Sequence, residues 1–386
     1  MTACRLCPRN CGIDRMSGKR GFCGVPATVY VARAALHFWE EPCISGSRGS
    51  GAVFFTGCGL KCVFCQIAPI SGVGSATGPD RSRSEAHEAG AGAGSRKGSG
   101  QIPERDSARN KRQLVSVPGK PVTEDHLAEI FLRLQNEQGA NNINLVTAVQ
   151  YIPQVAEALR LAKDQGLSIP VVYNSSGYEK AGALRLLEGL VDVWLPDFKY
   201  MDPEMARRYS GAPDYPERAK EAVAEMVRQA GEPEFYAEEP YGGDGRRISP
   251  GTYSEAGEGA GKVRTGAGTV SSDCSRYRSG QSLIRRGVIV RHLLMPGHVK
   301  NAEAVVRYLH DTYGDSIYIS MMNQYTPMKN LKMKAEDYRL LSRKVTKREY
   351  ERLIDYAVGI GIEKGFIQEG GTAKESFIPA WNGEGV

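Results

Sequence analysis

Apolar residues follow two alternating patterns along this chain: short unbroken runs, and longer stretches in which they return every three or four positions. An unbroken run such as Ile143–Val146 is typical of a strand buried on both faces. A stretch such as Glu124–Asn136 has the periodicity of a helix with one apolar face. These patterns predict strands at 52–56, 143–146, 169–173, 191–195, 288–294, 317–320 and 365–368, and helices at 124–136, 153–165, 179–187, 219–229, 302–313 and 347–358.

Two stretches interrupt these patterns, at about 72–118 and about 238–281. They are rich in small and polar residues, and the first contains the low-complexity run Gly90–Ser95. Such a composition cannot bury enough apolar surface to offset the entropy of ordering the chain, so both are interpreted as disordered insertions. Cys274 lies isolated in the second insertion and is interpreted as a bystander.

With the insertions set aside, strands and helices alternate, which predicts right-handed βαβ units and a parallel sheet in an α/β fold. About six such units are too few for a closed eight-stranded barrel, so the expected architecture is a partial (β/α)6 TIM-like barrel. The expected organisation is a Cys-rich N-terminal region at 1–45, the barrel at 46–370 and a C-terminal tail at 371–386. In parallel α/β folds the active site lies at the carboxyl ends of the strands.

The composition narrows the classes of protein to consider. The chain has 386 residues, of which 41% are hydrophobic, and a net charge of +6. This charge is too small to predict nucleic-acid binding. No apolar run is long enough to cross a bilayer and the N-terminus has no signal-peptide core, so a cytoplasmic protein without a membrane partner is expected. In a reducing compartment the nine cysteines favour metal binding or catalysis over disulfides.

Three cysteines form the motif Cys58-x3-Cys62-x2-Cys65, directly after the first predicted strand. Three thiolates at this spacing can surround one face of a cubane iron–sulfur cluster and leave one iron open for a ligand from outside the protein. The alternative is a zinc loop, although zinc takes four ligands, usually as pairs of Cys-x2-Cys. The position of the motif at the mouth of the predicted barrel favours the [4Fe–4S] cluster.

With Phe64 just before its last cysteine, the motif resembles the hallmark of the radical S-adenosylmethionine (radical SAM) superfamily. The resemblance implies a [4Fe–4S] cluster on Cys58, Cys62 and Cys65 whose open iron binds S-adenosyl-L-methionine. It also implies reductive cleavage of that cofactor to a 5′-deoxyadenosyl radical, which abstracts hydrogen from a substrate. Phe64 is then expected to pack near the adenine.

Longer stretches resemble a narrower set of radical SAM proteins, those related to pyruvate formate-lyase activating enzymes. These stretches are Cys4–Cys11, Gly21–Gly24, Glu40–Gly46 and Asn142–Thr147. The resemblance implies an oxidoreductase that abstracts hydrogen from a glycine of a glycyl radical enzyme, with electrons from flavodoxin or ferredoxin. Two alternatives stay open: a radical SAM enzyme that modifies another peptide or a small molecule, and a non-catalytic iron–sulfur protein that transfers electrons or forms a scaffold.

The same resemblance assigns cofactor-binding residues at the ends of two predicted strands. Asn144 and Thr147 belong to the segment where the activating enzymes receive the amino group of SAM. Asn174 and Ser176 follow the next strand and are candidates to hydrogen-bond the ribose or methionine part of SAM. The alternative for this second pair is a plain βα turn, because Asn and Ser favour turns.

Three further residues are candidates for catalysis. Asp197 and Lys199 are similar to the Asp-x-Lys of activating enzymes at the rim of the active site. The alternative is a surface ion pair, which contributes little to stability. His292 and Arg291 lie side by side in a predicted strand, where the pair would either face SAM or include a buried polar group with its hydrogen bonds satisfied.

The N-terminal region holds a second group of cysteines. Cys4, Cys7, Cys11 and Cys23 have the spacing Cys-x2-Cys-x3-Cys-x11-Cys, and four thiolates can complete a zinc site or a second iron–sulfur cluster. The alternative is a set of reduced, inert thiols. Cys43 is left over and is expected to be a buried thiol.

Overall fold

The computed structural model describes residues 2–72, 117–236, 282–328, 338–368 and 381–386. The first predicted insertion apart from residues 72, 117 and 118, the whole of the second, and the interpretation of Cys274 lie outside the described residues. Of the predicted C-terminal tail at 371–386, the structure describes residues 381–386.

A ten-stranded sheet forms the centre of the molecule, in the order β10-β9-β8-β6-β5-β4-β2-β1-β3, with β7 paired to β8 outside this path. From β2 to β10 neighbouring strands on this path are parallel and follow the order of the chain, whereas β1 pairs antiparallel with β2 and with β3. The predicted α/β fold with a mainly parallel sheet is therefore confirmed. The strands are β1 (Val29–His37), β2 (Ser50–Phe55), β3 (Lys120–Val122), β4 (Ile143–Val146), β5 (Val171–Ser175), β6 (Val193–Pro196), β7 (Glu234–Phe235), β8 (Ile284–Leu293), β9 (Tyr318–Met322) and β10 (Gly365–Ile367).

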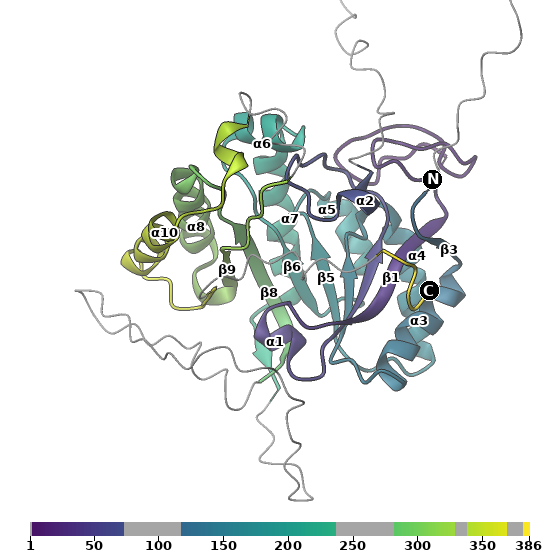
Figure 1. Ribbon diagram of the computed structural model, residues 1–386. Helices are drawn as coiled ribbons and strands as arrows, with labels where there is room; N and C mark the ends of the chain where they lie inside the picture. Colours follow the sequence, from purple (N-terminus) through teal and green to yellow (C-terminus); the bar gives the residue numbers. More distant parts are fainter. Residues whose placement is uncertain (1, 73–116, 237–281, 329–337, 369–380) are drawn as a thin grey trace, which may run out of the picture.

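Helices connect the parallel strands, and the long ones cover one face of the sheet (Figure 1). Their apolar residues join those of alternate strand positions in one large core, which is how an amphipathic helix buries its apolar face. The α-helices are α1 (Pro42–Ser45), α2 (Ala68–Ser71), α3 (Glu124–Asn136), α4 (Ile152–Asp164), α5 (Ala181–Leu184), α6 (Pro203–Ser210), α7 (Tyr215–Ala230), α8 (Val299–Tyr313) and α10 (Lys347–Gly359).

Local signals in the sequence explain where these helices begin. The Thr123 side chain accepts a hydrogen bond from the backbone of His126 and caps α3. Thr346 and Glu349 form a reciprocal capping box at the start of α10. Each cap satisfies backbone N–H groups that have no partner inside the helix, so the chain fixes both starting points locally.

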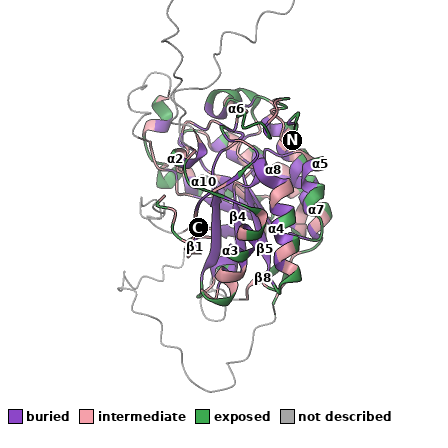
Figure 2. Ribbon diagram, turned by 90° about the vertical axis from the view of Figure 1, so that its right-hand side faces the viewer, coloured by how far each residue is buried: buried purple, intermediate pink, exposed green. Residues whose placement is uncertain are grey.

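The two faces of the sheet have different neighbours. Val53 and Phe55 of β2 pack into the helix-covered core, whereas Ala52 and Phe54 point to the opposite face, as the period of two along a strand requires. We call this second face the open face. The C-terminal residues contact part of it, since the ring centroids of Trp381 and Phe54 lie 5.2 Å apart. The strands are buried throughout most of their length (Figure 2).

Several elements were absent from the sequence-based prediction, among them β1 and α6. Strand β1 lies inside the region 1–45 and joins the central sheet, so within that region only the described residues 2–28 precede the first strand or helix. Its burial pattern lacks strict alternation, and its register with β2 shifts between Val31 and Arg33, which removes the periodic signal. Helix α6 begins with the Asp202 cap and Pro203, a start signal that the sequence offers.

None of the helices in the described part of the chain has the length and apolar character that a membrane span requires.

Candidate functional site

The Cys58–Cys65 loop follows β2 at the edge where the parallel strands end, near α2 and α6 (Figure 1). Backbone hydrogen bonds join the loop to α6, from Lys61 N to Ser210 O at 3.1 Å and from Val63 N to Tyr209 O at 2.9 Å. The three thiols are therefore carried on a loop with fixed backbone contacts, which reduces the entropy lost when they bind a ligand.

Cys62 of this loop is buried, Cys58 and Cys65 are half-buried, and the three thiols affect one another. Burial, followed by the nearby Cys62, raises the pKa of Cys58 to about 12 and that of Cys65 to about 11. The sulfur of Cys62 lies 3.0 Å from the hydroxyl oxygen of Ser210. Thiols in such surroundings stay protonated until a metal supplies the positive charge that stabilises the thiolates.

The chemistry of this donor set fits an iron–sulfur cluster, because thiolates are the usual ligands of such clusters. Across the described ranges, no group of three or more His, Cys, Asp or Glu side chains stands in an arrangement that could hold a metal ion. The three predicted ligands thus lie on one loop without converging on a single point, and binding requires adjustment of their side chains, which move among a few staggered rotamers.

A buried polar network crosses the open face of the sheet. Arg291 of β8 donates to Glu40 Oε2 at 2.8 Å, and Asn144 Nδ2 of β4 donates to Glu40 Oε1 at 2.9 Å. Asn174 of β5 donates to the same Oε1 at 3.2 Å and accepts from Arg291. We call these four residues the Glu40 network. It unites the predicted Asn144 and Asn174 around two charged residues from distant parts of the chain.

The Asp197–Lys199 pair continues this network toward the cysteine loop. Lys199 Nζ lies 2.5 Å from Asp197 Oδ2, and Arg291 Nε lies 3.4 Å from Asp197 Oδ1. Burial opposes the charge of Asp197, but Lys199 and Arg291 outweigh it and hold the pKa of the carboxyl below its usual value. The charge of Lys199 in turn lowers the pKa of Cys62, against the larger effect of burial. The ion pair is thus only partly exposed, and its charges influence a candidate ligand, unlike those of an ordinary surface pair.

The sequence places Glu40 only within a stretch of family resemblance, and it offers Arg291 only as one of a pair with His292. The signal that could have found Arg291 is its position as a charge within a buried apolar strand, where an unpaired guanidinium would be costly. Glu40 could not be paired with it in advance, because 251 residues separate the two.

His292 lies on the other face of the sheet from Arg291, as neighbours on a strand must. Its side chain is 1% exposed, and Nδ1 lies 2.7 Å from the carbonyl oxygen of Phe198. Burial lowers the pKa of His292 to about 4. The arrangement corresponds to the second alternative for this residue, a buried imidazole with a hydrogen-bond partner, and does not bring His292 into the Glu40 network.

The other predicted cofactor-binding residues take three different positions. Thr147 has a φ of 61°, a conformation that is costly for a β-branched residue, and its N–H donates to Asn174 O at 2.9 Å. Ser176 is partly exposed, and its carbonyl accepts from the Tyr215 hydroxyl at 2.8 Å. Phe64 is 7% exposed and packs near Tyr325.

Gly177 fixes the approach of two strand ends at this edge. Its φ is +73°, and a Cβ atom there would lie 2.2 Å from the carbonyl oxygen of Asp197. We expect Gly177→Ala to lower the free energy of unfolding by about 2–4 kcal/mol, through strain and steric overlap. Urea unfolding of the variant measures this loss. Gly182→Ala is the matched control, because a Cβ there meets nothing within 4 Å and the position is helical, so equal effects in both variants would contradict the account.

Glu179 provides a test that depends on pH. Burial raises the pKa of its carboxyl to about 8 from 4.5, against the smaller effect of Ser175. As the pH rises, Glu179 therefore ionises in the unfolded chain before it ionises in the folded protein. Its contribution to the free energy of unfolding falls as the pH rises from 4.5 and levels off above about 8.

We expect Glu179→Gln to remove most of this fall, which is at most about 1.4 kcal/mol per pH unit. Urea unfolding at pH 5 and pH 8.5 measures the difference for the variant and the wild type. Glu137→Gln, at an exposed carboxyl, should leave the fall in place. An unchanged pH dependence in Glu179→Gln would show that Glu179 ionises normally in the folded protein.

Comparisons with known proteins give little information on activity. No protein-family model matches the chain. An uncharacterized protein of Methanocaldococcus jannaschii is 23% identical over 354 residues, which are 92% of this chain and 74% of that protein. A chitinase domain from Pyrococcus furiosus aligns over 63% of this chain and 68% of its own, with 9% identity and a TM-score of 0.31. An N-acetylneuraminate lyase from Mycoplasma synoviae aligns over 65% of this chain and 86% of its own, with 12% identity and a TM-score of 0.23. Structural likeness at these scores carries no argument about function.

Proposed function

We propose that this chain is a radical SAM enzyme of the pyruvate formate-lyase activating enzyme-like type. The observation that carries the proposal is the position of three thiols at spacing x3 and x2. They follow the first parallel strand, at the sheet edge where parallel α/β proteins build their active sites. The parallel strands follow one another in chain order, which agrees with a partial barrel of this superfamily.

Cys58, Cys62 and Cys65 would hold the [4Fe–4S] cluster, which when bound supplies the electron for reductive cleavage of S-adenosyl-L-methionine. The loop shields these thiols from water in part, since two of the flanking side chains, Leu60 and Phe64, are 1% and 7% exposed. Exclusion of water protects reactive species from side reactions.

The Glu40 network would serve the polar part of the cofactor. Arg291 and Glu40 offer a donor and an acceptor of fixed orientation, because Arg291 donates to Oε2 of Glu40 while Asn144 and Asn174 both donate to its Oε1. A preorganised set of charged and amide groups suits a zwitterionic ligand, because the residues pay little entropy on binding. Thr147 contributes a strained backbone beside Asn174, and such strain is concentrated at ligand sites.

Asp197 and Lys199 would face the substrate, as a partly exposed ion pair that meets Arg291 of the network and whose charges influence Cys62. By resemblance, the hydrogen comes from a glycine of a partner glycyl radical enzyme, and the electron comes from flavodoxin or ferredoxin. That assignment rests on analogy and not on contacts of this chain. A different peptide or a small molecule remains the second candidate substrate.

Anaerobic reconstitution of the full chain with iron and sulfide, followed by dithionite and SAM, tests the proposal. We expect 5′-deoxyadenosine in the product mixture, because cleavage of SAM needs only the cluster, an electron and the cofactor. A fully loaded and reduced protein that forms no 5′-deoxyadenosine, alone or with a candidate glycyl radical enzyme, would favour the electron-transfer or scaffold alternative.

A further inference from the structure

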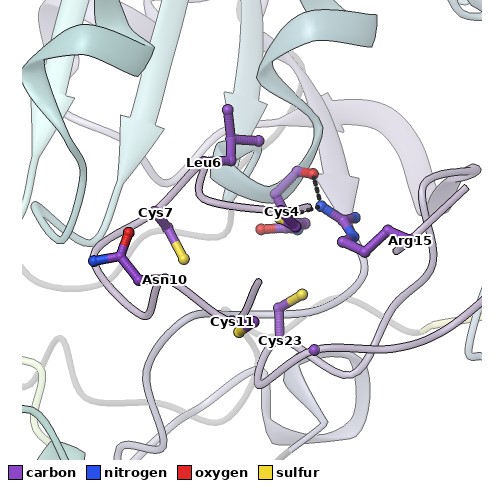
Figure 3. Close-up of a pocket in the computed structure, with 9 residues that line it drawn as sticks. Cys4, Leu6, Cys7, Asn10, Cys11, Arg15 and Cys23 are labelled. Carbon is purple, nitrogen blue, oxygen red and sulfur yellow. Dashed lines mark hydrogen bonds between the residues drawn. The ribbon is translucent and has the colours of Figure 1, made fainter. Parts of the chain in front are cut away.

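The first part of the chain encloses a cavity lined by sulfur atoms. Figure 3 shows Cys4, Cys7, Cys11 and Cys23 around this cavity, with the guanidinium of Arg15 beside Cys4. The four thiols come from positions spread over about twenty residues, and the surrounding residues 2–28 contain neither helix nor strand. The shape of this segment therefore depends on the contacts of its side chains.

Two of those contacts are hydrogen bonds to cysteine sulfur atoms, and a glycine leaves room for one of these atoms. The backbone N–H of Phe22 donates to Cys11 Sγ at 3.4 Å, and Arg15 donates to Cys4 Sγ at 3.8 Å. A Cβ atom at Gly21 would lie 3.0 Å from Cys11 Sγ, so glycine at this position leaves room for the sulfur. Hydrogen bonds of this kind orient ligand atoms around metals and stabilise thiolates.

The guanidinium of Arg15 brings a positive charge to the cavity. Arg15 is 1% exposed, and it donates to the carbonyl oxygens of Gln150 at 2.8 Å and Pro26 at 2.5 Å. Four thiolates around a divalent ion carry a net negative charge, which would favour a buried guanidinium next to them.

We propose that Cys4, Cys7, Cys11 and Cys23 form a second, tetrathiolate metal centre, which braces the loop that carries Cys58. Zinc and an iron–sulfur cluster are the two occupants whose chemistry four thiolates match. Because no three of these thiols converge on one point in the described chain, occupancy requires side-chain rotation.

Direct contacts connect this cluster with the first loop. Cys58 N donates to Cys23 O at 3.4 Å, and Arg9 Nε donates to Gly59 O at 2.7 Å. Gln150, whose carbonyl binds Arg15, donates through Nε2 to Thr56 O at 2.9 Å. Ordering the N-terminal cysteines would thus fix the backbone on both sides of Cys58.

The test uses the full chain with Cys58, Cys62 and Cys65 all changed to Ala, so it does not depend on the proposed activity. Elemental analysis should find about one zinc, or about four irons with sulfide, per chain. Adding Cys11→Ser should reduce that metal at least tenfold and lower the melting temperature, whereas adding Cys43→Ala should change neither the metal content nor its spectrum. Cobalt added to the metal-free triple variant should give a thiolate-to-cobalt charge-transfer band, or iron and sulfide should give cluster absorption.

Three results would overturn the proposal. The triple variant could fold with native circular dichroism and bind neither zinc, cobalt nor iron and sulfide. The metal could be retained after Cys11→Ser. Mass spectrometry could find the four thiols joined in disulfides in protein purified without oxygen. Each result concerns the N-terminal thiols in a protein without Cys58, Cys62 and Cys65, so it is independent of cluster binding by the first loop of the wild-type chain and distinct from failure of the proposed function.

Discussion

Cys62→Ala is expected to abolish formation of 5′-deoxyadenosine and to prevent assembly of the cluster on the first loop. Two thiols would remain for an iron–sulfur cluster that needs at least three protein ligands here. The charges of Lys199 and Asp197 also influence the pKa of Cys62, so the change removes this electrostatic interaction between the loop and the ion pair. Iron and sulfide analysis after reconstitution, with a product assay on the same sample, measures both effects.

Cys43→Ala is the matched control for this variant. Cys43 is 1% exposed and packs with apolar side chains of the open face, as the sequence predicted for a buried thiol. Its loss should cost about 1 kcal/mol of stability or less and leave cluster content unchanged. Normal product formation by Cys62→Ala would contradict the assignment of the first loop as the cluster site.

Arg291→Met is expected to lower the free energy of unfolding by about 3–5 kcal/mol. The guanidinium is the shared partner of Glu40, Glu41 and Asp197, with side-chain exposures of 8%, 7% and 21%. Removing one partner of a buried ion network leaves the carboxylates uncompensated, which costs more than the network contributes when intact. Urea unfolding at neutral pH measures the loss.

Arg285→Met, on the same strand, separates this effect from a general effect of losing an arginine. Its side chain is 63% exposed and its nearest carboxylate oxygen is 3.9 Å away, so a change within about 0.5 kcal/mol is expected. A small loss in Arg291→Met, similar to that in Arg285→Met, would show that the carboxylates of the network are neutral or reach solvent in the folded protein.

Much of the fold could be predicted from the sequence because its elements carry strong local signals. The predicted bounds of Glu124–Asn136 and Ile143–Val146 coincide with α3 and β4. Predictions were weaker where tertiary contacts decide the structure: β1 has no clean alternation and is formed by pairing with β2 and β3. The helix predicted at 179–187 is a short α5 followed by a 3-10 turn, within a segment that has Gly182 in its middle.

The candidate site could be predicted only in part, for a physical reason. Cysteine spacing is local information, so the sequence alone identified Cys58, Cys62 and Cys65 as a set. The Glu40 network depends on contacts across the sheet between residues far apart in the chain, and pattern reasoning on one sequence contains no such pairing. The choice between Arg291 and His292 depends on which face of β8 each occupies, and that is fixed by the register with its neighbours.

The most direct test of the central claim is the electron paramagnetic resonance spectrum of the reduced, reconstituted full chain before and after addition of SAM. If three thiolates hold the cluster and one iron is open, SAM should bind that iron and change the spectrum. The Arg291→Met variant, provided that it loads the same amount of iron, should need a higher SAM concentration for the same change. A fully loaded and reduced protein whose spectrum is identical with and without SAM would show that the iron has no open position, and would contradict the account.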